Sequence, residues 1–162
     1  MEEQFIFFWD GPFSQWHPSN FVIDGVEYNC AEQYMMAEKA RLFKDKDAEE
    51  KIMESIHQPA VQKAWGKKVR NFDVDKWNEV CKDVVYRANY AKFTQNEKLG
   101  KYLHGSIGKT IVEASPYDVI WGIGLGENDP RRFDRKQWRG KNWLGEVVMK
   151  VRDDLYENIE GS

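Results

Sequence analysis

Residues 75–91, DKWNEVCKDVVYRANYA, carry the pattern that decides the fold class. Apolar side chains recur there every three or four positions, at Trp77, Cys81, Val84, Ala88 and Ala91. This spacing places them on one side of an α-helix and leaves charged residues on the other side. The stretch therefore predicts a long central helix against which other helices pack.

The segments around this helix predict more helices and a small β element. Capping residues, breakers and helical periodicity predict further helices over residues 29–43, 47–56, 59–66, 94–105 and 142–155. Short apolar runs predict strands at residues 4–9, 110–115 and 118–124, and Asp24-Gly25 predicts a hairpin turn within FVIDGVEY. Residues 1–162 are expected to form a single domain, mainly α with a small β element.

Composition limits the function classes. The chain has 24 basic and 27 acidic residues, a formal charge of -3, which argues against a general nucleic-acid clamp. Two distant cysteines and three histidines show no metal-ligand spacing, so neither a metal nor another cofactor is expected. No apolar run approaches the ~18 residues of a membrane span, and the N-terminus is acidic. We expect a soluble cytoplasmic protein without membrane contact or an obligate protein partner.

A second stretch, NCAEQYMMAEKA at residues 29–40, places a carboxylate and an amine on one side of a helix. Seven positions separate Glu32 from Lys39, and this interval returns to within about 20° of the same helix face. The two residues lie roughly 10 Å apart along the axis, too far for a direct ion pair. Asn29 and Glu32 also match a capping box, so Glu32 is either a helix cap or a functional carboxylate.

Residues 121–126, WGIGLG, place three glycines at alternating positions after an apolar run. The spacing differs from the GxGxxG fingerprint of dinucleotide-binding folds. Alternating glycines allow a ligand to approach the backbone, and they equally suit a plain turn. Trp121 could stack a base or fill the core, and Asp118 and Glu113 could face a pocket or solvent.

Residues 131–143, RRFDRKQWRGKNW, form the strongest local positive cluster. Its cations surround Trp138 and Trp143, an arrangement that suits a nucleotide, and the nearly neutral chain favours a small phosphorylated ligand. Asn142 is placed to cap the last helix, whose free N–H groups and dipole attract anions, and Gly145 leaves room for close approach. This region is therefore a candidate phosphate site.

Four motifs occur in order along the chain and together resemble the NADAR family, also called YbiA-like. They are FSQWHPSNFVIDGVEYNCAEQYMMAEKA, KFTQN, VEASPYDVIWGIG and W-x-G-K-N-x-L-G at residues 138–145. The similarity extends from Phe13 to about Arg152. It implies a mostly helical fold and an N-glycosidase-type cleavage of the bond between a ribose C1 and a nitrogen. Substrates in the family include phosphoribosylamino intermediates of riboflavin synthesis and ADP-ribose attached to guanine, so ADP-ribosylated DNA is a candidate substrate.

The resemblance also implies the site residues. They are the catalytic candidates Glu32, Lys39 and Asp118 and the substrate-binding candidates Trp16, Trp121, Gly122, Gly124, Trp138, Asn142 and Gly145. Two positions depart from the family pattern. Many relatives have Ser-Asn-Phe where this chain has Ser14-Gln15-Trp16, and many have His where Gln33 stands. These departures affect the expected substrate more than the expected reaction.

Cleavage of a ribosyl C–N bond develops positive charge at C1, and a nearby carboxylate stabilises that charge. We expect Glu32 to act as general base or charge stabiliser, with Asp118 as a second carboxylate. Lys39 either binds the substrate or attacks the opened C1 as a neutral amine, a form that the apolar Met35 and Met36 beside it would favour. Two other classes remain open: a nucleotide-binding or ADP-ribose-binding module without catalysis, and a structural partner protein.

Overall fold

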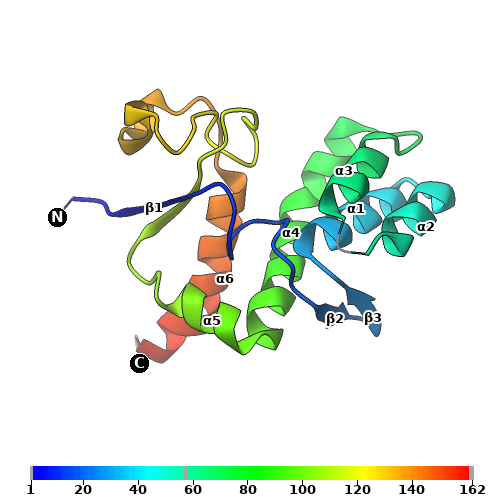
Figure 1. Cartoon of the computed structure of the whole chain (residues 1–162), viewed down its shortest axis with the longest axis horizontal. Helices are drawn as coiled ribbons and strands as arrows, with labels where there is room; N and C mark the ends of the chain where they lie inside the picture. Colours follow the sequence, from blue (N-terminus) through cyan, green and yellow to red (C-terminus); the bar gives the residue numbers. More distant parts are fainter. Residues whose placement is uncertain (1, 57, 161–162) are drawn as a thin grey trace. The chain divides into compact units, whose positions relative to one another are not determined.

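The computed structural model describes residues 2–56 and 58–160 (Figure 1). Contacts within the chain divide it into two compact units, one made of Met1–Ser14 with Lys98–Ser162 and the other of Gln15–Glu97. The described residues form six α-helices and two sheets of two strands each. The predicted class, mainly α with a small β element, is confirmed. That residues 1–162 act as a single domain stays a prediction.

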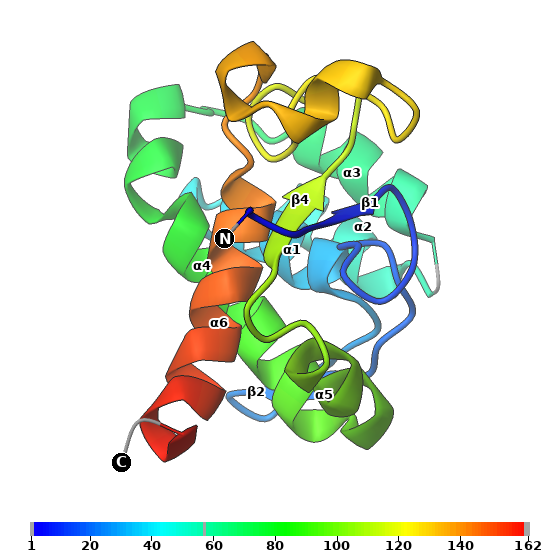
Figure 2. The same ribbon diagram turned by 90° about the vertical axis from the view of Figure 1, so that its left-hand side faces the viewer.

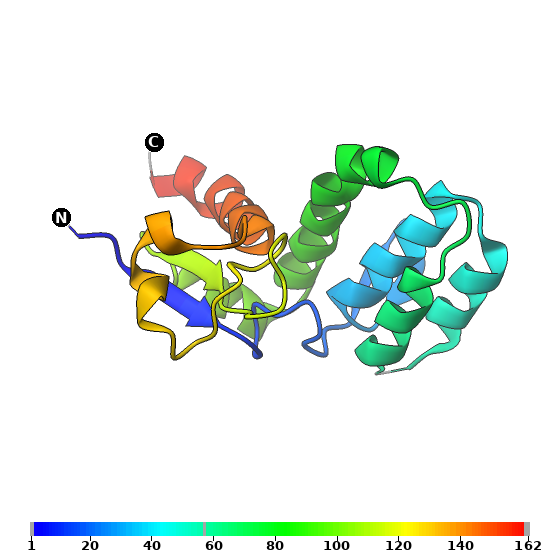
Figure 3. The same ribbon diagram turned by 90° about the horizontal axis from the view of Figure 1, so that it is seen from above.

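The unit Gln15–Glu97 consists of a β-hairpin followed by four helices. These elements are β2 (Phe21–Ile23), β3 (Val26–Tyr28), α1 (Ala31–Leu42), α2 (Lys46–Glu54), α3 (Pro59–Lys67) and α4 (Val74–Gln95). Helix α1 packs against α2, α3 and α4, and Figure 3 shows the α1, α2 and α3 ribbons side by side. Helix α4 contains the predicted stripe, and all five of its apolar residues are buried. The central packing helix is therefore confirmed.

The hairpin forms at the predicted turn. Asp24 and Gly25 both have positive φ, 53° and 80°, as the tight turn of a two-residue hairpin requires. Beside the hairpin, the buried ring of Tyr34 lies 6.5 Å from the ring of Phe21 and 5.0 Å from that of Tyr28, measured between centroids. These aromatic contacts fix the hairpin against the first turns of α1.

Helix α1 is buried on nearly every side. A Cβ atom at Gly66 of α3 would overlap Sδ of Met36, so α3 can approach α1 closely only because Gly66 has no side chain. The buried residues of α1 are Ala31, Glu32, Gln33, Tyr34, Met35, Met36, Ala37 and Ala40. Because little of this helix faces solvent, its polar side chains lie inside the unit, where charges are unfavourable without compensation.

In the other unit, two strands far apart in sequence pair in parallel. Strand β1 (Phe5–Phe8) lies beside β4 (Thr110–Glu113), with Phe5 opposite Thr110. Helix α6 (Trp143–Glu160) packs on β4, and Figure 2 shows α6 beside the two strands. Helix α5 (Glu97–His104) precedes β4, and two short 3-10 helices, η1 (Pro130–Phe133) and η2 (Arg135–Gln137), precede α6. The core of this unit contains Val112, Ile123 and Leu125, with Phe5, Phe7 and Trp138 packed against it.

Two predicted features differ from the structure. Residues 118–124 form no strand, because the carbonyl groups of residues 119–122 accept hydrogen bonds from the N–H groups of residues 141–144 instead of pairing with a neighbouring strand. Thr94 opens no helix, because its hydroxyl donates to the carbonyl of Tyr90 at 2.6 Å, inside α4. Helix α4 continues to Gln95, one residue beyond the predicted start of the next helix, and α5 begins at Glu97.

Candidate active site

At the start of α1, the side chain that accepts a backbone N–H from the residues before the helix is that of Gln33 and not that of Glu32. Cys30 occupies the N-cap position without a side-chain capping bond, and Oε1 of Gln33 accepts the N–H of Asn29 at 2.8 Å. The side chain of Asn29 donates to the carbonyl of Ser55 at 3.0 Å. The predicted capping box of Asn29 and Glu32 is therefore wrong.

Glu32 is buried, with 6% of its surface exposed. Its backbone N–H donates to the carbonyl of Gln15 at 3.0 Å, which ties the first turn of α1 to the segment that precedes the hairpin. Burial is the main influence on the pKa values of both Cys30 and Lys39, and the negative charge of Glu32 raises each of them. A buried carboxylate that acts electrostatically on a thiol and an amine is typical of a functional site.

Lys39 lies half-buried on the same helix. Its ammonium group is 4.5 Å from the centroid of the Phe72 ring, a cation–π contact. Burial lowers the pKa of Lys39, the charge of Glu32 acts against that shift, and the positive charge of Lys67 lowers the pKa further. The pKa of Lys39 is therefore lowered, which is the direction expected for an amine that becomes neutral more easily. Met35 and Met36 are both buried, as part of the apolar surroundings expected for this side of the helix.

Lys92 of α4 is a functional candidate that sequence reasoning missed. Its side chain is fully buried, and burial lowers its pKa from 10.5 to about 7. The pKa of His17 is lowered by burial and by the charge of Lys92, and that charge also acts on Cys30, whose pKa burial raises to about 11. Lys92 therefore lies near the N-cap of α1, beside the turn that carries Glu32. An amine with a pKa near neutrality is a suitable nucleophile or proton carrier.

Polar side chains connect α4 to the start of α1. Nδ2 of Asn89, a fully buried residue, donates to Oε1 of Gln15 at 2.9 Å and to the carbonyl of Val85 at 2.8 Å. Its Oδ1 is buried and has no hydrogen-bond partner among the described residues. Because an unsatisfied buried acceptor is unfavourable, this oxygen is a candidate contact for a ligand. Asn89 and Lys92 are three positions apart on the buried side of α4.

Trp16 is the next residue after Gln15, whose side chain bonds to Asn89. It is 43% exposed, and the ammonium of Lys63 lies 6.0 Å from its ring centroid. An exposed indole near a cation is compatible with the predicted stacking of a planar group. Glu32, Lys39, Trp16 and the unpredicted Lys92 thus belong to one compact unit, the unit Gln15–Glu97.

The remaining predicted residues belong to the other unit, where Asp118 shapes a loop. Its Oδ1 accepts the N–H groups of Ile120 at 2.9 Å and Trp121 at 2.8 Å. The Trp121 ring lies 5.7 Å from the Trp143 ring in an edge-on arrangement. A carboxylate that accepts successive backbone N–H groups stabilises a turn. This contact assigns Asp118 a structural task, and its catalytic role stays a prediction.

The glycines of this loop are required by packing. A Cβ atom at Gly122 would lie 3.0 Å from both the carbonyl oxygen and Oε2 of Glu113. Gly124 has φ +71°, a conformation that side chains disfavour, and a Cβ atom there would lie 2.8 Å from Cβ of Arg139. These contacts support the turn interpretation of WGIGLG, while ligand contact by either glycine stays a prediction.

The start of α6 is already occupied by protein groups. The N–H groups of Asn142, Trp143 and Leu144 donate to the loop carbonyls of residues 120–122, so the expected free donors for an anion are absent at these three positions. The side chain of Asn142 accepts the N–H of Glu113 at 3.0 Å and donates to the carbonyl of Ile111 at 3.0 Å. Asn142 directly precedes α6, as predicted, and its carbonyl accepts the N–H of Glu146 at 3.0 Å, while its side chain joins the helix to β4. A Cβ atom at Gly145 would overlap Oδ1 and Nδ2 of Asn142, so Gly145 allows the same close packing.

The basic cluster at residues 131–143 is partly neutralised and partly used in packing. Arg131 pairs with Asp129, and Arg135 pairs with Glu3. The guanidinium of Arg132 lies 5.2 and 4.2 Å from the rings of Phe7 and Phe133. The indole N–H of Trp138 donates to the carbonyl of Arg132 at 2.7 Å, and its ring packs against the core of this unit. These contacts weaken the interpretation of the cluster as a phosphate site.

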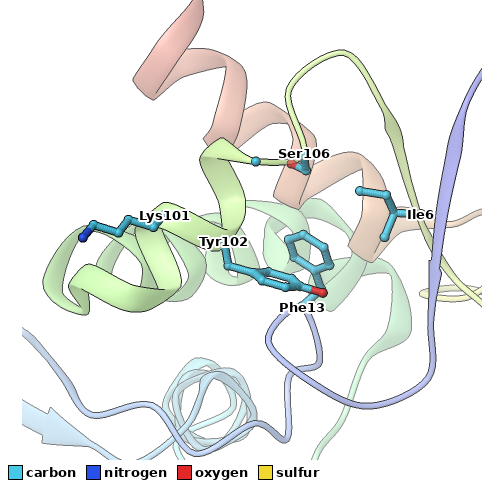
Figure 4. A pocket seen from close by; sticks show the side chains of 6 residues that line it. Ile6, Phe13, Lys101, Tyr102 and Ser106 are labelled. Atoms are coloured by element: carbon cyan, nitrogen blue, oxygen red, sulfur yellow. The ribbon is translucent and has the colours of Figure 1, made fainter.

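Two surface cavities contain none of the predicted catalytic residues. One, of about 300 Å³, is lined by Ile6, Phe13, Lys101, Tyr102, Gly105 and Ser106. Figure 4 shows the Tyr102 and Phe13 rings close together and Lys101 pointing away from them. The other, of about 380 Å³, lies between α4 and the hairpin and is lined by Val22, Ile23, Tyr86, Arg87, Tyr90, Ala91, Thr94 and Gln95. In this second cavity, the side chain of Gln95 already accepts the N–H of Val22 and donates to the carbonyl of Val22.

Within residues 2–56 and 58–160, no group of three or more His, Cys, Asp or Glu side chains is placed to hold a metal ion. Of the three histidines, His57 lies outside the described residues. The helices in this described part include none that is both long and apolar enough to span a membrane.

Comparison with known proteins identifies relatives over nearly the whole chain. N-glycosidase R617 of Acanthamoeba polyphaga mimivirus is 47% identical over 147 residues, which cover 88% of this chain and 86% of that protein. The riboflavin biosynthesis protein PYRR, chloroplastic, of Zea mays is 31% identical over 86 residues, which cover 53% of this chain and 12% of that protein.

Structure comparison and a family profile agree with these relatives. The NMR structure of the Escherichia coli protein YbiA matches with a TM-score of 0.79 and 26% sequence identity, covering 100% of this chain and 90% of that chain. In the sequence comparison, the same protein carries the name N-glycosidase YbiA and is 28% identical over 145 residues. The profile of the NADAR domain matches residues 7–156, so it includes most of both compact units. The chain therefore belongs to the NADAR domain family.

Proposed function

We propose that this chain hydrolyses the bond between a ribose C1 and a nitrogen in a phosphoribosyl or ADP-ribosyl compound. Relatives named N-glycosidase confirm the enzyme class, a hydrolase of N-glycosyl bonds. The name of the maize relative, a riboflavin biosynthesis protein, supports a phosphoribosylamino intermediate as one substrate. The observation that carries the proposal is the buried carboxylate of Glu32, which takes no part in the helix cap and lies near a buried amine.

In this proposal Glu32 supports both halves of a hydrolysis. As the C1–N bond breaks, positive charge develops at C1, and the carboxylate stabilises it. Water then forms the new C1–O bond and gives up a proton to Glu32, while the departing nitrogen takes up one proton. The buried Oδ1 of Asn89 is placed in the same polar group and supplies an acceptor for a substrate hydroxyl or amine.

A covalent version of the mechanism assigns the nucleophile to Lys92 more readily than to Lys39. A neutral amine attacks C1 of the ring-opened substrate, where C1 is doubly bonded to the substrate nitrogen, and that nitrogen leaves as an amine when the C1–N bond breaks, so that an imine forms on the lysine. Water then hydrolyses this imine and releases the sugar as an aldehyde. The attacking amine has to be neutral, and burial lowers the pKa of Lys92 to about 7. Lys39 is half-buried and its ammonium lies over the Phe72 ring, which favours the binding role predicted for it. Borohydride reduction during turnover, followed by peptide mapping, distinguishes an adduct on Lys92 from one on Lys39.

The experiment that tests the function is a product assay by mass spectrometry on guanine-ADP-ribosylated DNA and on the phosphoribosylaminopyrimidine. Wild type is compared with Glu32→Gln and with a matched control, Glu38→Gln, which changes a half-buried carboxylate of the same helix. We expect release from at least one substrate by wild type and by Glu38→Gln, and a loss of at least about 100-fold in Glu32→Gln. If the folded wild type binds ADP-ribose but releases no product from either compound, the chain is a nucleotide-binding module and not this enzyme.

A further inference from the structure

Two buried carboxamides, those of Gln15 and Asn89, lie against the side of α1 that carries Glu32. The backbone carbonyl of Gln15 accepts the N–H of Glu32 at 3.0 Å. The side-chain Nε2 of Gln15 donates to Sδ of Met35 at 3.8 Å, and Met35 follows Glu32 by three positions. Because residues three positions apart are neighbours on a helix surface, Gln15 extends along the side of α1 that Glu32 shares. Oε1 of Gln15 accepts Nδ2 of Asn89 at 2.9 Å, which joins α4 to this side.

The hydrogen bonds determine which atoms of the two amides remain available. Nδ2 of Asn89 also donates to the carbonyl of Val85 at 2.8 Å. A carbonyl oxygen accepts hydrogen bonds and does not donate them, so the Asn89 amide cannot be reversed. Its Oδ1 is therefore directed away from Val85 and Gln15, and this buried atom has no hydrogen-bond partner among the described residues. The Gln15 amide is oriented in turn, and its Nε2 meets a sulfur atom, which is a weak acceptor.

This arrangement is unfavourable for folding alone. Gln15 and Asn89 are both buried, and a buried polar atom without a full partner loses the hydrogen bond that it makes to water in the unfolded chain. A hydroxyl group of a ligand matches both atoms, because it donates one hydrogen bond and accepts others. The pair is therefore suited to a ligand that presents a hydroxyl group at the side of Glu32.

We propose that Asn89, oriented by Gln15, binds the hydroxyl group on C2 of the substrate ribose. This inference rests on the proposed function for the identity of the sugar. With C1 at the Glu32 carboxylate, the C2 hydroxyl is on the neighbouring carbon; Oδ1 of Asn89 accepts its proton and Nε2 of Gln15 donates to its oxygen. In glycoside hydrolysis, hydrogen bonds to this hydroxyl strengthen as positive charge develops at C1.

The consequence of this contact is selection against 2-deoxyribosyl compounds. The phosphoribosylaminopyrimidine and ADP-ribosylated guanine both carry the C2 hydroxyl on the ribose that is released, whereas the deoxyribose of DNA lacks it. A site that bonds a substrate hydroxyl rejects the analogue without it, because the buried polar atoms of the site then stay unpaired. The pair thus allows cleavage of a ribosyl group attached to DNA and spares the C1–N bonds of the DNA itself.

The test measures kcat/KM for the compound that wild type cleaves and for its 2-deoxyribosyl analogue, and takes the ratio of the two. The variants are Gln15→Met and Asn89→Leu, which remove the polar atoms and keep the size of each side chain. The control is Gln95→Met, because the Gln95 carboxamide also makes two hydrogen bonds, both to backbone groups of Val22. We expect a ratio of at least about 100 in wild type and in the control, and a ratio at least about tenfold lower in Gln15→Met and Asn89→Leu. Loss of stability alone lowers both rates together and leaves the ratio unchanged.

Calorimetric titration of the full chain with ribose 5-phosphate and with 2-deoxyribose 5-phosphate gives a second readout that needs no turnover. We expect wild type and Gln95→Met to bind ribose 5-phosphate more tightly, and Gln15→Met to lose this preference. Thermal melts establish that each variant is folded, and Gln15→Met carries the test if Asn89→Leu does not fold.

Three results would overturn the proposal: no preference for the ribosyl compound in wild type, an equal change of the ratio in Gln15→Met and Gln95→Met, or neither binding nor cleavage of any ribosyl compound. The two readouts also separate this proposal from the enzymatic function. A binding preference that depends on Gln15, without product release, contradicts the enzymatic function alone. Product release without any preference contradicts the hydroxyl site alone.

Discussion

Replacing Lys92 by methionine should stabilise the folded chain near neutral pH. Burial lowers the pKa of Lys92 from 10.5 to about 7, a shift that corresponds to roughly 5 kcal/mol between its two protonation states. Between these pH values the unfolded chain binds the proton and the folded chain releases it, so the free energy of unfolding rises with pH by up to about 1.4 kcal/mol per unit. Methionine has similar length and no charge, so Lys92→Met lacks this dependence.

The assay is urea unfolding of wild type and Lys92→Met at several pH values from 7.5 to 9.5, followed by both fluorescence and circular dichroism. We expect the variant to be about 2–4 kcal/mol more stable at the lower pH, because lost polar contacts offset part of the full effect. The difference should narrow by about 2 kcal/mol across the range. A difference that stays constant with pH would refute the assignment of a neutral buried amine.

Three further outcomes are expected. Gly145→Ala should lower the free energy of unfolding by about 1–3 kcal/mol, because a Cβ atom there overlaps the carbonyl oxygen of Ile111; Gly126→Ala, with its nearest neighbour at 3.9 Å, should change the melting temperature little. Gln33→Ala should destabilise the chain by about 1 kcal/mol in urea unfolding, because it removes the acceptor for the N–H of Asn29. Product release should survive dialysis against EDTA, and a loss restored by added metal would contradict the expected absence of a metal site.

Local sequence signals predicted most elements of the fold. The hairpin turn at Asp24-Gly25 and the stripe on α4 both depend on a few neighbouring residues, so they are visible without knowledge of the rest of the chain. The pairing of β1 with β4 was not predictable in this way. Phe5 lies opposite Thr110, and such a parallel contact between distant segments leaves no local pattern.

Residues 118–124 show how an apolar run can be mistaken for a strand. The short apolar run is compatible with extended backbone, and it is the basis of the strand prediction. In the structure, the carbonyl groups of Trp121 and Gly122 accept the N–H groups of Leu144 and Asn142. A local sequence pattern predicts which side chains are buried, but it does not predict which distant N–H group donates a hydrogen bond to a given backbone carbonyl.

The candidate site was only partly visible because its chemistry depends on burial. The spacing of Glu32 from Lys39 made it a candidate in the sequence, where it also matched a helix cap. In the structure, Gln33 and not Glu32 accepts the N–H of Asn29 at the helix start. Lys92 gave no comparable sign, because a lysine beside alanine and phenylalanine normally reaches solvent from the edge of a core. Here the start of α1 covers that edge and Lys92 is fully buried. A buried lysine weakens the fold, so its position beside the turn of Glu32 supports the proposed function and is not explained by stability.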